Sequence, residues 1–145
     1  MKPIRTWIVL ADTKTVRIAV NDGPGKGVYG HSTQGLKAPP VTALSDEPGM
    51  TFASFGPNRG GISDPDLKGQ AAHAFAVKIV EYLDDALAQG SYQRLILIAP
   101  AAMLGRLRQA ITPSLQAVLL DEIPKDLTHL PLDELPAHLA DVLAV

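Results

Sequence analysis

The residue most like a catalytic group is Asp12, which ends the first apolar run of the chain. An aspartate in such a position can bind Mg²⁺ in nucleases, but these sites need two or more converging carboxylates. Asp64 and Asp66 are explained by a helix start, and Asp121 and Glu122 by a turn after a strand. Asp12 itself suits a hairpin turn, because its side chain can bond to the backbone that follows. We therefore expect a turn residue, and a metal-dependent nuclease or hydrolase that uses Asp12 remains the alternative.

A second group of residues could bind phosphate. Arg59 precedes the adjacent glycines Gly60 and Gly61, whose backbone freedom would let a loop enter a narrow cavity. Together with Arg106 and Arg108, Arg59 could contact phosphate oxygens. The simpler explanation is a loop tip followed by solvated cations on a helix face. The candidate binding residues are Asp46, Arg59, Gly60, Gly61, Arg106 and Arg108.

The other chemistry-bearing residues form no motif. The four histidines, at positions 31, 73, 129 and 138, lack the spacing of a zinc site. The absence of cysteine excludes disulfides and thiol catalysis. Gly23–Gly27 looks like a phosphate cradle, but no Gly-Lys-Ser/Thr opens into a helix there. We expect no metal, no cofactor and no evident small-molecule substrate.

Composition indicates one globular domain spanning residues 1–145. The chain has 145 residues, of which 46% are apolar, and a net charge of −2 that argues against binding a nucleic-acid duplex through bulk positive charge. No apolar run approaches the roughly 18 residues of a spanning helix, and the N-terminus lacks the apolar core of a secretion signal. We therefore expect a cytoplasmic protein without membrane insertion, and not an adhesin at the cell surface.

The first half of the chain predicts a β-meander and a long helix. Two β-rich runs, Trp7–Ala11 and Val16–Val20, flank a polar turn, and a third strand is expected near Gly27–Thr33. A Gly/Pro-rich loop insertion is expected at residues 34–63, and a loop of this length is usually either functional or disordered. Apolar residues at three- and four-residue steps then predict a helix from Asp64 or Pro65 to a stop at Gly90.

The second half predicts alternating helices and strands. Arg94–Ala99 is apolar on both sides, which is typical of a central parallel strand. We expect a short helix over residues 104–111, a strand at Ala117–Leu120 and a final helix that begins at Thr128 or His129. The fold class is therefore α/β, with a mixed sheet of about five strands and three main helices.

Four segments in this order and spacing resemble the bacterial host attachment protein family, described as proteins required for attachment to host cells. The segments are Leu44–Gly49, Ala74–Ala76, Leu95–Pro100 with Leu104–Arg108, and Ile123–Thr128. The resemblance covers nearly the whole chain. It departs from the family pattern at Met50, where members tend to have arginine, and at Ala101, where they have a second proline.

That family is considered similar to the central domain of archaeal and eukaryotic peptide-chain release factors, which implies an RNase H-like sheet. Release factors use a Gly-Gly-Gln tip to position water for ester hydrolysis, whereas here Gly61 is followed by Ile62. The resemblance therefore does not bring peptidyl-tRNA hydrolysis to this chain.

Three functions remain open from the sequence. We favour a non-catalytic binding module linked to attachment, which touches the ribosome or RNA through residues 45–61, Arg106 and Arg108. The alternatives are a hydrolase or nuclease of RNase H-like type, and an accessory factor in adhesion that acts through protein contacts alone.

Overall fold

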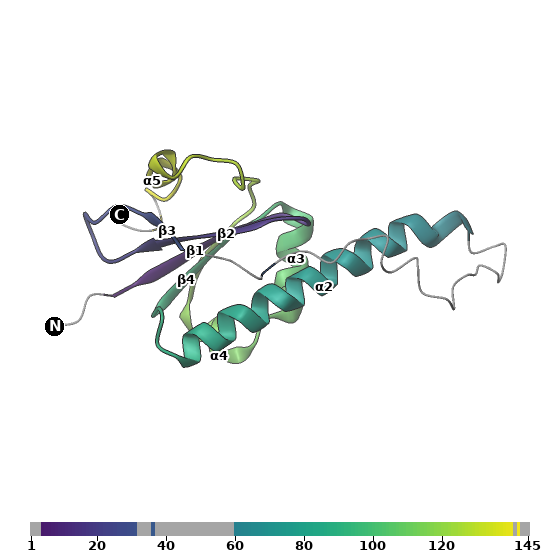
Figure 1. Ribbon diagram of the computed structural model, residues 1–145, viewed down its shortest axis with the longest axis horizontal. Helices are drawn as coiled ribbons and strands as arrows, with labels where there is room; N and C mark the ends of the chain where they lie inside the picture. Colours follow the sequence, from purple (N-terminus) through teal and green to yellow (C-terminus); the bar gives the residue numbers. More distant parts are fainter. Residues whose placement is uncertain (1–3, 32–35, 37–59, 141, 143–145) are drawn as a thin grey trace.

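The protein is described by a computed structural model covering residues 4–31, 36, 60–140 and 142, with side chains within 60–140 described from Gly69 onward. Its centre is a five-stranded sheet of order β3-β2-β1-β4-β5 (Figure 1). The strands are β1 (Thr6–Ala11), β2 (Val16–Asn21), β3 (Tyr29–His31), β4 (Arg94–Ile98) and β5 (Leu119–Ile123). β2 runs antiparallel to both β1 and β3, whereas β1, β4 and β5 are parallel. The predicted α/β class with a mixed five-stranded sheet is confirmed.

Two unequal layers cover the sheet. One face carries the long helix α2 (Gly60–Ala88) with α3 (Ala101–Ala110) and α4 (Pro113–Val118). The other carries the 3-10 helix η3 (Leu132–Glu134) and the single turn α5 (Leu135–His138) (Figure 1). We call residues 124–140, which include η3 and α5, the C-terminal strap. In the described residues, no helix has the length and apolar character needed to cross a bilayer.

The central strand β1 shows how the sequence pattern assigns side chains to the two layers. All six of its residues are buried. Trp7 and Val9 pack on the side of α2 and α3, whereas Ile8 and Leu10 pack on the side of the strap. The alternation follows from the period of two of a β-strand, and a continuous apolar run is what a strand covered on both faces requires.

Helix α2 begins earlier than the sequence predicts. Its first residue is Gly60, so Gly60 and Gly61 lie in a helical turn, not at the tip of a loop. The expected start at Asp64 or Pro65 is therefore wrong by about one turn, because the cap-like residues there lie inside the helix. The predicted end is confirmed: the helix stops at Ala88, and Gly90 has a φ of 78°, the left-handed conformation that favours glycine after a helix.

The link between β4 and β5 also differs from the prediction. The expected strand at Ala117–Leu120 is wrong in its first residues, because residues 113–118 form α4. Thr112 caps this helix by accepting a 3.2 Å hydrogen bond from the Leu115 backbone N–H, and Pro113 fits the first helical position. These local signals override the β-propensity of the residues that follow.

Within the described residues, the final helix expected from Thr128 or His129 does not form as one continuous helix. Residues 128–129 form a turn, and the helices that follow them there are η3 and α5. Pro131 precedes η3 and Pro136 lies within the short α5, so neither residue supplies the backbone N–H that a longer helix would need.

Candidate functional site

Asp12 lies at the end of β1, in the turn that leads to β2. One carboxylate oxygen, Oδ1, accepts hydrogen bonds from the backbone N–H groups of Lys14 and Thr15, both at 2.7 Å, and from the Thr15 hydroxyl at 3.0 Å. The other oxygen, Oδ2, accepts from the Thr128 hydroxyl at 3.2 Å. Both oxygens of Asp12 are therefore engaged by the chain itself, as a turn residue requires.

These donors also shift the titration of Asp12. Partial burial raises the pKa of its carboxyl, but the four hydrogen bonds lower it more, so the pKa lies below the ordinary value of 3.8. The group is thus held as a carboxylate. Within residues that the structure describes, no three metal-ligating side chains gather at any place.

Thr128 and Arg17 fasten the C-terminal strap beside Asp12. The buried Thr128 hydroxyl lies 2.9 Å from Asp126 Oδ1 as well as near Asp12. Arg17, on β2, donates from Nη1 to the carbonyls of Thr128 at 2.8 Å and of Leu130 at 2.7 Å. Through these hydrogen bonds, four side chains join the β1–β2 hairpin to the strap. We call this group the polar latch; its members are Asp12, Arg17, Asp126 and Thr128.

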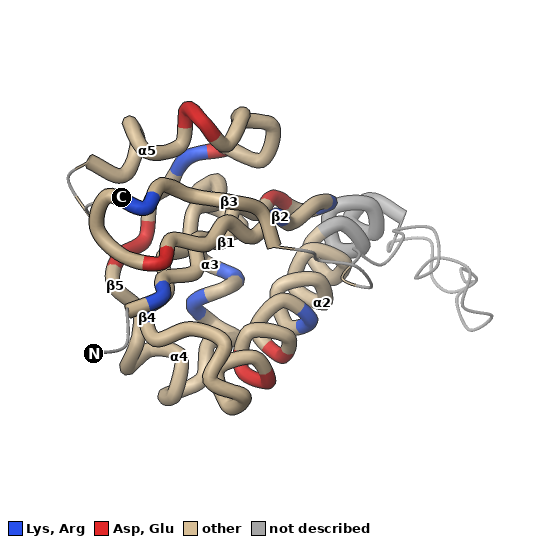
Figure 2. Tube along the Cα trace, turned by 60° about the vertical axis from the view of Figure 1, so that its left-hand side comes forward, with Lys and Arg blue, Asp and Glu red and all other residues tan. Residues whose placement is uncertain are grey.

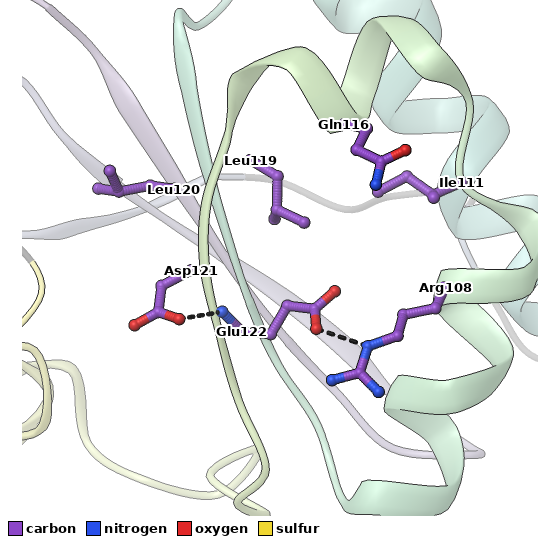
Figure 3. Close-up of a pocket in the computed structure, with 7 residues that line it drawn as sticks. All are labelled: Arg108, Ile111, Gln116, Leu119, Leu120, Asp121 and Glu122. Carbon is purple, nitrogen blue, oxygen red and sulfur yellow. Dashed lines mark hydrogen bonds and ion pairs between the residues drawn. The ribbon is translucent and has the colours of Figure 1, made fainter.

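The candidate phosphate-binding residues do not come together. Arg106 and Arg108 are two residues apart on α3, which places them about 200° apart around the helix axis. A Cβ atom built on Gly69 of α2 would lie 3.0 Å from Arg106 Nη2, so Arg106 faces α2. Arg108 instead forms an ion pair with Glu122 of β5, with Nε 2.6 Å from Oε1 (Figure 3). The two guanidinium groups therefore cannot converge on one phosphate.

The remaining predicted binding residues give no further geometry. Arg59 and Asp46 lie outside the described residues, and Gly60 and Gly61 are the first two residues of α2. Basic and acidic residues of the described chain are spread over several elements (Figure 2). Such a distribution is not the basic stripe that marks a surface for nucleic acid.

An open pocket of about 630 Å³ lies between α3, α4 and β5. Its lining combines apolar side chains, an amide and an ion pair (Figure 3), and consists of Arg108, Ile111, Gln116, Leu119, Leu120, Asp121 and Glu122. Only Arg108 was predicted from the sequence as a site residue. The one signal that could have pointed to the rest is the pair Asp121 and Glu122, which is unusual inside a strand.

Strand β5 forms one edge of the sheet beside this pocket. Leu119 lies opposite Leu95 of β4, but the next residue of β4, Ile96, lies opposite Asp121. Leu120 is therefore the extra residue of a β-bulge, and 41% of its surface is exposed. Bulges at sheet edges re-aim side chains, and here one apolar side chain is turned to solvent.

One histidine joins an aromatic cluster at the opposite edge of the sheet. The His31 ring on β3 lies 4.5 Å from the ring of Trp7, measured between centroids, and its Nε2 lies 3.1 Å from the Tyr82 hydroxyl oxygen. The Tyr92 ring lies 4.6 Å from Trp7 on the same side of the sheet as α2. The cluster ties β3 and α2 to the centre of the sheet.

Comparison with known families gives one match. A family model described as "Protein required for attachment to host cells" matches residues 7–139. The chain belongs to this family. The match runs from β1 to just past α5, so the pocket and the polar latch both lie within the part that defines a host attachment protein. A comparison with curated protein sequences gives no match.

Proposed function

We propose that this host attachment family chain is a non-catalytic binding module that contributes to attachment by binding another protein at the α3–α4–β5 pocket. The observation that carries the proposal is the open pocket of about 630 Å³ beside an edge strand. Its lining of leucine, isoleucine, an amide and charged groups resembles the mixed character of protein–protein interfaces. Action from the cytoplasm is part of this proposal.

The Asp12 alternative has less support. A catalytic carboxylate must bind a metal ion or exchange a proton, whereas all four hydrogen bonds to Asp12 hold its own turn and the strap. These bonds give Asp12 a structural role that needs no metal ion and no proton transfer. The RNase H-like and release-factor-like comparisons stay predictions.

Binding to the ribosome or RNA is the second alternative. Arg106 and Arg108 face different neighbours, and Arg108 already neutralises Glu122. The Arg108 guanidinium uses Nε for Glu122, and the carboxylate beside it weakens the attraction that a phosphate would meet there. For these reasons protein contact is the function that the arrangement of these residues favours.

The proposal is tested by blocking the pocket in cells. Gln116 is exposed and lines the pocket, so Gln116→Trp should fill it without disturbing the core. The matched control is Gln70→Trp, at an exposed position of α2 away from the pocket. A strain lacking the chain is complemented with each form, and bacteria attached to host-cell monolayers are counted.

We expect Gln116→Trp to lower attachment at least tenfold relative to the Gln70→Trp strain, at equal protein level. Equal attachment by the two strains would overturn the pocket as the binding site. Co-purification of RNA with the wild-type chain that weakens steeply as salt is added, and is lost in Arg106→Glu, would favour the RNA alternative.

A further inference from the structure

Strand β5 has a free edge among the described residues, because its pairing there is with β4 alone. An edge strand presents a row of backbone N–H and C=O groups that can pair with another extended chain. We propose that β5 accepts an extended segment of a partner protein as a sixth strand. In this arrangement a lysine or arginine of the segment pairs with Asp121, and a large apolar side chain enters the pocket. The inference rests on the proposed function and names its partner chemistry.

The bulge gives the edge two distinct faces. Figure 3 shows Leu119 and Glu122 directed toward α3 and α4, and Leu120 and Asp121 directed to the other side. Side chains of an added strand alternate between these faces. All four of these residues line the pocket, so a partner strand along this edge would contact Leu119 and Glu122 on one face and Leu120 and Asp121 on the other.

Charge selects the partner. The Glu122 carboxylate is already neutralised by Arg108 at 2.6 Å. The Asp121 carboxylate accepts the neighbouring Glu122 backbone N–H at 2.8 Å, and within the described part of the chain it forms no ion pair. A basic residue directly across from Asp121 would gain a favourable cross-strand pair.

The same charge disfavours a second copy of this chain at the edge. Antiparallel pairing of β5 with itself would bring the segment Asp121–Glu122 close to its own copy, and like charges across strands are destabilising. An acidic segment of any other protein would meet the same repulsion. The edge therefore fits a basic, apolar strand.

Apolar contacts supply the rest of the recognition. Leu120 is one of the exposed large apolar residues of the described chain, with 41% of its surface accessible to solvent. On the other face, the accessible lining of the pocket is mainly polar, and Ile111 and Leu119 supply a small apolar wall within it. A volume of about 630 Å³ is ample for a phenylalanine or leucine side chain, which would cover this wall from water.

The proposal is tested by NMR on the full chain labelled with ¹⁵N. The probe is the blocked peptide acetyl-Lys-Val-Lys-Phe-Lys-Val-amide, titrated to millimolar concentration. We expect shifts of the backbone amides of Leu119–Ile123 and of the Gln116 side-chain amide. A peptide of the same sequence, N-methylated at alternate residues, keeps charge and side chains but cannot pair as a strand, so its affinity should fall at least tenfold.

Variants test the charge. Asp121→Lys should weaken binding of the lysine peptide at least tenfold, and Asp121→Asn by up to about fivefold, the factor expected for losing one cross-strand pair. The control Asp133→Asn removes an exposed carboxylate from η3, which lies near β3 at the opposite edge of the sheet, and should leave binding unchanged.

Three results would overturn the inference. The first is that the N-methylated peptide, or a peptide with glutamate at each lysine, binds as tightly as the lysine peptide. The second is that Asp133→Asn weakens peptide binding as much as Asp121→Asn does. The third is that the backbone amide signals of β5 do not shift when the peptide is added. Failure here is distinguishable from failure of the proposed function. If Gln116→Trp lowers attachment but β5 does not pair with the peptide, the pocket remains a binding site for a partner of another shape. If the peptide binds β5 but Gln116→Trp leaves attachment normal, the proposed function is rejected instead.

Discussion

The two faces of the sheet are covered in different ways. On one face, α2, α3 and α4 bring a broad set of buried side chains against the sheet, with Phe75, Ile79 and Leu83 of α2 at 1% exposure or less. On the other, the strap contributes Leu135 and Leu139 as its fully buried apolar residues in the described chain. The first layer is held by the area that it buries.

The strap compensates with polar bonds. Arg17 donates to two strap carbonyls, and Thr128 reaches Asp12 across the end of the sheet. Hydrogen bonds to charged groups stabilise by more than neutral ones, at about 1.5–3 kcal/mol each. A short, proline-rich segment can therefore cover one face of a sheet when hydrogen bonds from charged side chains hold it in place.

The largest effect should come from the helical face. Phe75 is fully buried, so Phe75→Ala leaves a cavity and should lower the free energy of unfolding by about 3–5 kcal/mol. Urea denaturation followed by far-UV circular dichroism measures this loss. If Phe75→Ala lowers the free energy of unfolding by less than any strap variant does, the helical layer is not the more strongly held of the two.

Leu135→Ala should lower the free energy of unfolding by less, about 2–3 kcal/mol. This is the lower end of the range for a buried leucine, because the thin strap can collapse into the cavity. Leu135 is 1% exposed. The same denaturation series measures the loss. Hydrogen exchange should show that amides of residues 124–140 lose protection before those of β1, and simultaneous loss over the whole chain would contradict a separate strap.

Arg17→Met should cost about 1.5–2 kcal/mol, because it removes the charged donor to the Thr128 and Leu130 carbonyls. The control is Arg5→Met, which removes an exposed ion pair with Asp22 and should cost less than about 1 kcal/mol. Limited proteolysis should cut the strap faster in Arg17→Met alone. Equal cutting of both variants would show that the strap does not depend on Arg17.

The smallest effect is expected at Asp12. Because folding lowers the pKa of its carboxyl below 3.8, the carboxylate adds stability that is complete above pH 3.8 and is lost as the pH falls through the lower folded value. Asp12→Asn keeps an acceptor for the turn but removes the charge, at a cost of about 1 kcal/mol near neutral pH. Thermal unfolding of both proteins from pH 7 to pH 2 should show their difference vanish in acid, and a constant difference would contradict the role given to the charge.

Much of the fold is predictable because its signals are local. The alternation of side-chain types in β2 and the periodic apolar residues of α2 indicate which side of each element is buried. Gly90, with its positive φ, indicates where the helix ends. The division between α4 and β5 was missed, since a Thr112 cap and a β-rich run overlap within a few residues. The apolar periodicity near the C-terminus predicts a longer final helix than forms, because Pro136 lies within α5 and lacks a backbone N–H.

The candidate site was less predictable. The sequence pointed to Arg106 and Arg108 as a pair, but their spacing on a helix already separates them. What each arginine contacts depends on elements far away in the chain: Gly69 in one case and Glu122 in the other. No local pattern predicts such partners.

The sequence by itself determined the strands β1, β2 and β4 and most of α2, together with which of their faces are apolar, because propensity and periodicity act over a few neighbouring residues. The tertiary structure alone decided that β5 lies at the edge, that its bulge exposes Leu120, and that α3 and α4 leave a pocket beside it. These features arise from pairing and packing between residues distant in sequence. The same packing made Asp12 and Thr128, which are 116 residues apart, into one latch.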